Sequence, residues 1–144
     1  MKRASEHNLK NMTTESLNKA DRFPTIRTTT TISDANPGGD IFGGWLLAQM
    51  DIAGGVAAYA YAQSRIVTVG IEAMSFHQPV FVGDEVSFYT DVHKIGTTSI
   101  TIKIEAWADR KSTGDTVHVT EGLFTYVAIN DQRQPKTIQR GSHA

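Results

Sequence analysis

An apolar stretch from Trp45 to Ala62 constrains the fold of this chain more than any other segment. It is rich in alanine, leucine and methionine, which favour an α-helix, and its only strongly polar residues are Gln49 and Asp51. A helix that is apolar on almost every side must be enclosed by lipid or by protein. The polar residues and the pair Gly54-Gly55 interrupt the run that a membrane span needs, so we expect protein to enclose it. Each glycine costs about 1 kcal/mol relative to alanine in a helix, which predicts that another backbone packs close to the pair.

Strands are predicted on both sides of this helix. The segment from Thr25 to Ser33 is rich in β-branched residues, which suit a pleated surface. After the helix, period-two alternation predicts four more strands, beginning near Val67, Val86, Ile100 and Val117 and separated by turns or loops. The order is strand, long helix and four strands in hairpin succession. It predicts an α+β fold in which an antiparallel sheet curls around one central helix.

Several predicted strands carry apolar residues on both faces. We place the following residues on the face turned away from the helix: Met74, Phe76, Tyr89, Trp107 and Tyr126. A monomer would leave such residues exposed as one apolar patch. We therefore expect the protein to form a homo-oligomer.

Composition and charge narrow the possible functions. The chain has 144 residues, which fits one domain, and its 14 basic and 15 acidic residues leave no charged block that would attract nucleic acid. It has no cysteine, which excludes disulfides, thiolate metal sites and a cysteine nucleophile. Residues 1–22 are polar and lack the apolar core of a signal peptide. We expect a cytoplasmic protein with a flexible leader (1–22), one domain (23–131), a polar tail (132–144) and no membrane association.

The loop before the helix carries the most chemical information. Residues 34–40, DANPGGD, concentrate turn-forming residues, and Asp40 stands just before the helix start. The unpaired N–H groups of a first helical turn can stabilise an oxyanion that develops on an attacked carbonyl. Gly43 and Gly44 let a ligand approach this backbone closely. On these residues alone, Asp40 is equally consistent with a functional carboxylate and with a plain helix N-cap.

The segment from Gly39 to Asp51, GDIFGGWLLAQMD, resembles the helix-entry signature of the YciA-like acyl-CoA thioesterases of the hotdog superfamily. The segment 67–76, the turn 79–84 and the hairpin 95–99 follow in that family's order and spacing, so the resemblance spans residues 25–130. It implies a hotdog fold, a sheet wrapped around a central helix, that assembles as dimers and commonly as trimers of dimers. It also implies hydrolysis of acyl-CoA to a free fatty acid and CoA, without a cofactor.

The resemblance makes Asp40 the catalytic residue. As a general base, Asp40 would take a proton from the attacking water while the amides of Gly43 and Gly44 polarise the thioester carbonyl. Direct attack by Asp40, which would give a mixed anhydride, is an alternative that the sequence leaves open. Asn36 matches an asparagine at the start of the family's loop and is expected to position the substrate or the water. Turn formation is the other explanation for Asn36.

Further candidates for substrate contact lie in three segments. They are Phe42 at the helix start, Thr68, Glu72 and Ser75 on the following strand, and Gly96, Thr97, Thr98 and Ser99 in the hairpin turn. The three strand residues are equally consistent with a plain surface position or a subunit interface. The turn lacks the basic residue often found there in the family, which leaves its contacts with CoA open. Asp51 is better explained as a hydrogen-bonded residue within the helix packing.

The five histidines raise the question of a metal site, but none has HxH or HExxH spacing, so we expect no metal. His77 stands where the sequence departs from the family, and it receives no role. A hotdog hydratase or dehydratase would need a histidine near Asp40, and none occurs between Lys10 and Phe76. The second alternative is a module that binds acyl-CoA without hydrolysing it. The presence of a candidate catalytic carboxylate at Asp40 disfavours this alternative.

Overall fold

The computed structural model describes residues 22–139. The expected leader, apart from Arg22, and residues 140–144 of the expected tail lie outside the described residues. The elements are β1 (Ile26–Thr29), a short 3-10 helix η1 (Ile32–Asp34), α3 (Gly43–Ala62), β2 (Ile66–Phe76), β3 (Glu85–Ile95), β4 (Ser99–Asp109) and β5 (Thr116–Ala128). This order of one strand, one long helix and four strands confirms the predicted α+β class.

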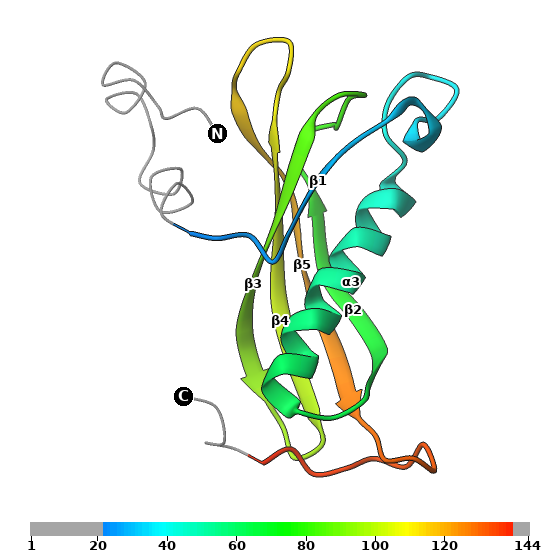
Figure 1. Ribbon diagram of the computed structural model, residues 1–144, viewed down its shortest axis with the longest axis vertical. Helices are drawn as coiled ribbons and strands as arrows, with labels where there is room; N and C mark the ends of the chain where they lie inside the picture. Colours follow the sequence, from blue (N-terminus) through cyan, green and yellow to red (C-terminus); the bar gives the residue numbers. More distant parts are fainter. Residues whose placement is uncertain (1–21, 140–144) are drawn as a thin grey trace.

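The five strands form one antiparallel sheet in the order β1-β3-β4-β5-β2, and α3 lies across one of its faces (Figure 1). The predicted hairpins β3-β4 and β4-β5 are present. The expected hairpin succession was wrong for β2, which pairs with β5 at the edge of the sheet instead of with β3. Alternation of side chains reports the face on which a residue lies but not which strand is its neighbour.

The first strand is shorter than the predicted 25–33, because Thr30 and Thr31, which follow it, make side-chain hydrogen bonds that do not belong to the strand ladder. Thr30 is buried, and its hydroxyl donates to the backbone oxygens of Phe81 (2.9 Å) and Asp84 (3.0 Å). The backbone N–H of Thr31 donates to the Asp34 carboxylate at 2.9 Å and so caps η1. Local side-chain hydrogen bonds of this kind compete with a strand ladder.

The buried side of α3 packs on the sheet through Leu46, Met50, Ala53, Gly54 and Ala58. A Cβ atom added at Gly54 would overlap the Tyr126 hydroxyl and would lie 2.6 Å from Cδ1 of Ile104. At Gly55 the nearest atom would be Cδ1 of Ile66, at an ordinary 3.7 Å. The sheet therefore packs unusually close to the helix at Gly54 but not at Gly55. The atoms that approach Gly54 belong to side chains of the sheet, whereas the prediction was another backbone.

The predicted outward patch was wrong for Tyr126 and Met74, because β-bulges shift the alternation of side chains. β2 has irregular register between Thr68 and Gly70 and between Glu72 and Ser75. Among the residues placed in that patch, Tyr126 faces the helix, Met74 packs against the core, Tyr89 and Trp107 are each only 5% exposed, and Phe76 is 55% exposed.

Exposed apolar side chains also lie on the open side of α3 and on β2. They include Ile52, Val56 and Tyr59 on the helix and Val69 and Ile71 on the strand, between 46% and 58% exposed. Within one chain the sheet thus encloses only one side of the apolar helix. The exposed apolar surface that suggested an oligomer is present, but it lies beside an edge of the sheet.

The core extends beyond β5. Ile138 is 4% exposed, and its backbone N–H donates to the oxygen of Thr97 at 2.8 Å. The N–H of Lys136 donates to the oxygen of Ala128, also at 2.8 Å. The described part of the expected tail therefore packs along the end of the sheet. No helix among residues 22–139 is long and apolar enough to cross a membrane.

Candidate active site

Asn36 shapes the loop that precedes α3. Its side-chain oxygen accepts a hydrogen bond from the N–H of Asp40 at 3.1 Å, and its own N–H donates to the Asp40 oxygen at 2.7 Å. The N–H of Gly39 donates to the Asn36 oxygen at 3.0 Å, and Gly39 has a φ of 94°, which favours glycine. Asn36 therefore folds the loop around Asp40 and holds the backbone of that residue at both of its polar groups.

Asp40 lies at the helix start without capping it. Its backbone forms an isolated bridge with Phe81, and the N-cap of α3 is Phe42, which makes no side-chain hydrogen bond to the helix. The alternative that Asp40 is a plain N-cap is therefore wrong. Its side chain is exposed and makes no hydrogen bond or ion pair with residues 22–139, so the carboxylate is available to a ligand.

The first turn of α3 also offers unused donors. Within the described chain, no loop or turn hydrogen bond uses the N–H of Gly43 or Gly44, as is normal for a first helical turn. A Cβ atom added at either glycine would meet nothing within 4 Å. The helix start is thus open, and its N–H groups can donate to an incoming oxygen.

A pocket of about 340 Å³ collects part of the predicted site. Asn36, Asp40 and Gly43 line one side of it, whereas Gly44 and Phe42 are not among its lining residues. The segment 76–80, which includes His77 and Gln78, forms another wall. This wall is held to β5 because the N–H of His77 donates to the Val119 oxygen at 2.8 Å. Sequence reasoning missed His77 and Gln78 because no local motif marks them.

None of the other substrate-binding candidates is among the lining residues of this pocket. Thr68, Glu72 and Ser75 lie on the edge strand β2, and the Thr68 hydroxyl donates to the Asp51 carboxylate at 2.7 Å. The turn from Gly96 to Ser99 joins β3 to β4 near the C-terminal end of α3 (Figure 1), whereas Asp40 precedes the N-terminal end of this helix. A single chain therefore does not bring these candidates together with Asp40.

Asp51 links α3 to the sheet. Its backbone oxygen accepts from the Tyr126 hydroxyl at 2.9 Å, and its carboxylate lies 3.2 Å from the same hydroxyl. Burial of the phenol, followed by the nearby Asp51 carboxylate, raises the pKa of Tyr126 well above its ordinary value. Asp51 thus makes the hydrogen bonds that were expected of a polar residue within the helix packing.

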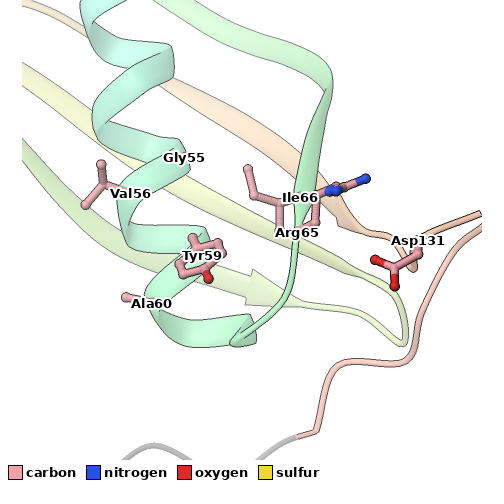
Figure 2. A pocket seen from close by; sticks show the side chains of 7 residues that line it. All are labelled: Gly55, Val56, Tyr59, Ala60, Arg65, Ile66 and Asp131. Carbon is pink, nitrogen blue, oxygen red and sulfur yellow. The ribbon is translucent and has the colours of Figure 1, made fainter. Parts of the chain in front are cut away.

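A larger hollow of about 750 Å³ lies along the later turns of α3 (Figure 2). Its lining residues are Gly55, Val56, Tyr59, Ala60, Arg65, Ile66 and Asp131. Figure 2 shows Ile66 pointing from the start of β2 toward the helix, with Arg65 and Asp131 at the far side. The hollow is large enough for a small ligand, but it has no carboxylate beside a helix start.

The fold and the helix-start pocket define a hotdog protein: an antiparallel sheet wrapped around one long helix, with a carboxylate beside the N-terminus of that helix. A family model described as "Thioesterase superfamily" matches residues 38–114. The chain belongs to the thioesterase superfamily, and its resemblance to the YciA-like members is confirmed.

Two relatives illustrate the similarity. The chain is 45% identical over 116 residues to a protein of Salmonella typhimurium named acyl-CoA thioester hydrolase YciA, a match covering 78% of this chain and 87% of that protein. It is 46% identical over 116 residues to an uncharacterized acyl-CoA thioester hydrolase of Buchnera aphidicola, covering 78% of this chain and 86% of the relative.

Two solved structures have the same fold. A hexameric thioesterase of Yersinia pestis superposes with a TM-score of 0.79 at 45% identity, covering 84% of this chain and 98% of that one. A hexameric hotdog fold thioesterase of Campylobacter jejuni superposes with a TM-score of 0.77 at 39% identity, covering 81% and 90%.

Proposed function

We propose that this protein hydrolyses the thioester bond of acyl-CoA to a free fatty acid and CoA, with Asp40 as the general base. The activity follows from membership of the superfamily and from relatives that are named acyl-CoA thioester hydrolases. One observation supports the role of Asp40: its exposed carboxylate shares a pocket with Gly43, whose N–H is one of the unpaired amides of the helix start.

The reaction needs only groups that this chain supplies. Asp40 accepts a proton from water, and the resulting hydroxyl attacks the thioester carbonyl. The negative charge that develops on the carbonyl oxygen is stabilised by the N–H groups of Gly43 and Gly44. Collapse of the tetrahedral intermediate breaks the carbon–sulfur bond, and the proton held by Asp40 passes to the CoA thiolate. Asn36 fixes the backbone of Asp40, and no cofactor is required.

We place the complete site between two copies of the chain. β2 is an edge strand with exposed Val69 and Ile71, and such an edge is a template for pairing with another strand. Pairing of β2 with its equivalent about a two-fold axis makes the two copies of α3 antiparallel. The Asp40 pocket of one copy then comes beside the larger hollow and the 96–99 turn of the other. This arrangement accounts for the separation of these parts in one chain.

The similar structures of Yersinia pestis and Campylobacter jejuni are hexameric, which supports a trimer of such dimers for this chain. We further propose a cytoplasmic role in fatty acid metabolism. Partners other than acyl-CoA and further copies of the chain are not needed for this activity.

The test is Asp40→Asn, which preserves the size of the side chain but removes the base. Release of free thiol from acyl-CoA substrates of several chain lengths should fall by about 100-fold or more in this variant. Asp115→Asn, which neutralises an exposed loop carboxylate outside the pocket, is the matched control and should retain activity. Light scattering and thermal unfolding should be unchanged in both variants. Near-normal turnover in Asp40→Asn would overturn the assignment.

The same assay separates two other possibilities. If acyl-CoA binds tightly to the wild-type protein without release of thiol, the chain is a binding module and not an enzyme. If CoA appears in a burst that precedes the fatty acid, Asp40 attacks the substrate directly and forms a mixed anhydride. Simultaneous release of both products is the result expected for general-base catalysis.

A further inference from the structure

Two histidines and a glutamate meet on the face of the sheet turned away from α3. His77 follows β2, and His118 and Glu121 lie on β5. Oε1 of Glu121 lies 3.9 Å from Nε2 of His77 and 3.7 Å from Nε2 of His118. Each residue offers one potential metal ligand, a histidine nitrogen or a carboxylate oxygen, and these three atoms all lie within 4.8 Å of one another.

A β-bulge creates this cluster. The register between β4 and β5 shifts where Ala106 pairs with Thr120 and Trp107 pairs with His118, so β5 carries one extra residue there. Without the bulge, His118 and Glu121 would lie on opposite faces of β5, because residues three apart in a strand point to opposite sides. The extra residue turns both side chains to the outer face.

The neighbours of the cluster hold two of its members in place. The His118 ring stacks on Trp107, with ring centroids 4.7 Å apart and an angle of 19° between planes. The backbone of His77 is fixed by its hydrogen bond to Val119. Lys103 lies 3.7 Å from Oε2 of Glu121, which leaves Oε1 directed toward the histidines.

One atom of the cluster needs a partner. Nε2 of His118 is buried and makes no hydrogen bond with residues 22–139, and Oε1 of Glu121 at 3.7 Å is too far to supply one. A buried polar atom without a partner destabilises the folded protein. A metal ion bound by this nitrogen would remove that destabilisation.

We propose that His77, His118 and Glu121 bind one Zn²⁺ ion, with the fourth position open to water. Two imidazole nitrogens and one carboxylate oxygen suit zinc, whereas Ca²⁺ and Mg²⁺ prefer sets of oxygen ligands. In tetrahedral zinc sites with bonds of about 2.0–2.1 Å, ligand atoms lie roughly 3.4 Å apart. The separations from Glu121 of 3.7 and 3.9 Å require small movements, and the ligand atoms of the two histidines, which lie within 4.8 Å of each other, can approach further because His77 is exposed and can rotate toward the ion.

The ion would act on the pocket through its wall. His77 also belongs to the segment 76–80, which lines the same pocket as Asp40. Zinc bound at the cluster ties this segment to β5 by a second link, in addition to the hydrogen bond with Val119. The ion is a structural element of the wall, and the site stands independently of the proposed hydrolysis.

Binding can be measured on the full chain after removal of metals with a chelator. Calorimetric titration with ZnCl₂ should show one ion per chain, and Zn²⁺ should raise the melting temperature. Co²⁺ or Cu²⁺ should quench the fluorescence of Trp107, which stacks on His118, and Zn²⁺ should reverse the quenching. Trp107→Phe should bind Zn²⁺ but lose most of the quenching, since Trp45 lies on α3.

The exposed position of His77 and the partial exposure of Glu121 make His77→Ala and Glu121→Gln suitable test variants. Each should weaken Zn²⁺ binding by at least about 100-fold, because loss of a direct ligand costs at least as much as loss of an outer-shell partner. His93→Ala, an exposed histidine on β3, is the matched control and should bind as the wild type does. No binding by the wild type, or equal binding by the test variants, would overturn the proposal. Equal binding would assign the zinc to histidines outside the cluster.

Discussion

Gly54 and Gly55 are neighbours in one helix, yet replacing each with alanine should change the stability of the protein in opposite directions. Alanine in either position favours the helix by about 1 kcal/mol. At Gly55 the new methyl group makes only ordinary contacts, the nearest at 3.7 Å, so Gly55→Ala should stabilise the protein by about 0.5–1 kcal/mol.

At Gly54 the methyl group meets atoms that cannot easily move. It overlaps the Tyr126 hydroxyl and lies 2.6 Å from Cδ1 of Ile104, and such overpacking costs about 1–3 kcal/mol. Displacing the hydroxyl from the Asp51 oxygen leaves buried groups unpaired and costs about 1–3 kcal/mol more. After the gain in helix propensity, the net loss is about 3 kcal/mol, which corresponds to a fall of roughly 10 °C in melting temperature.

The assay is urea and thermal unfolding of both variants at one protein concentration, since assembly makes melting temperatures depend on concentration. Tyr126→Phe in the Gly54→Ala background should recover part of the loss, because it removes the overlapping atom. If Gly54→Ala and Gly55→Ala agree within about 0.5 kcal/mol, which is the typical effect of a substitution outside packed sites, the packing explanation is refuted.

Three further predictions concern stability and assembly. Asp84→Ala should destabilise the protein by about 3–5 kcal/mol in urea unfolding, because it leaves the buried guanidinium of Arg110 without the carboxylate 2.5 Å away. The double variant Asp84→Ala/Arg110→Ala should lose less stability than the sum of the two single variants. Burial and the Asp51 carboxylate raise the pKa of Tyr126 above its ordinary value of 10.0. The unfolded chain therefore loses the phenol proton at a lower pH than the folded chain, and the free energy of unfolding should fall as pH rises above 10.0. Tyr126→Phe should show a shallower fall of the unfolding free energy at alkaline pH, and an unchanged slope would contradict the prediction. Ile71→Lys on the β2 edge should reduce the mass measured by light scattering, whereas a wild-type protein that is monomeric at micromolar concentration would exclude pairing through this edge.

Much of the fold is predictable because it depends on local patterns. The apolar composition from Trp45 to Ala62 indicates the helix, which begins at Gly43 in the structure, and alternation indicates each of the later strands. What the pattern does not contain is pairing: β2 joins β5, and bulges reverse the face of residues such as Tyr126. Both depend on the packing of distant segments, which no local period reports.

The candidate site divides in the same way. Asn36, Asp40 and Gly43 are close in the sequence, so a single loop brings them to one pocket. Another wall comes from residues 76–80, at and after the end of β2, which are distant from the loop in the sequence. The cluster of His77, His118 and Glu121 was invisible to a search for local metal-ligand spacing, because two strands and a bulge bring its members together.

The pairing of β2 with β5 has a consequence for synthesis on the ribosome. β2 follows directly after α3, but its partner β5 is the last strand of the chain. The pairing of Ile66 with Ala128 can therefore form only after the ribosome has synthesised β5. Until then the growing chain carries a long apolar helix without the finished sheet to cover it. Exposed apolar surface makes such a nascent chain prone to aggregation, which chaperones counteract. Because the sheet needs its last strand, folding is completed late in translation.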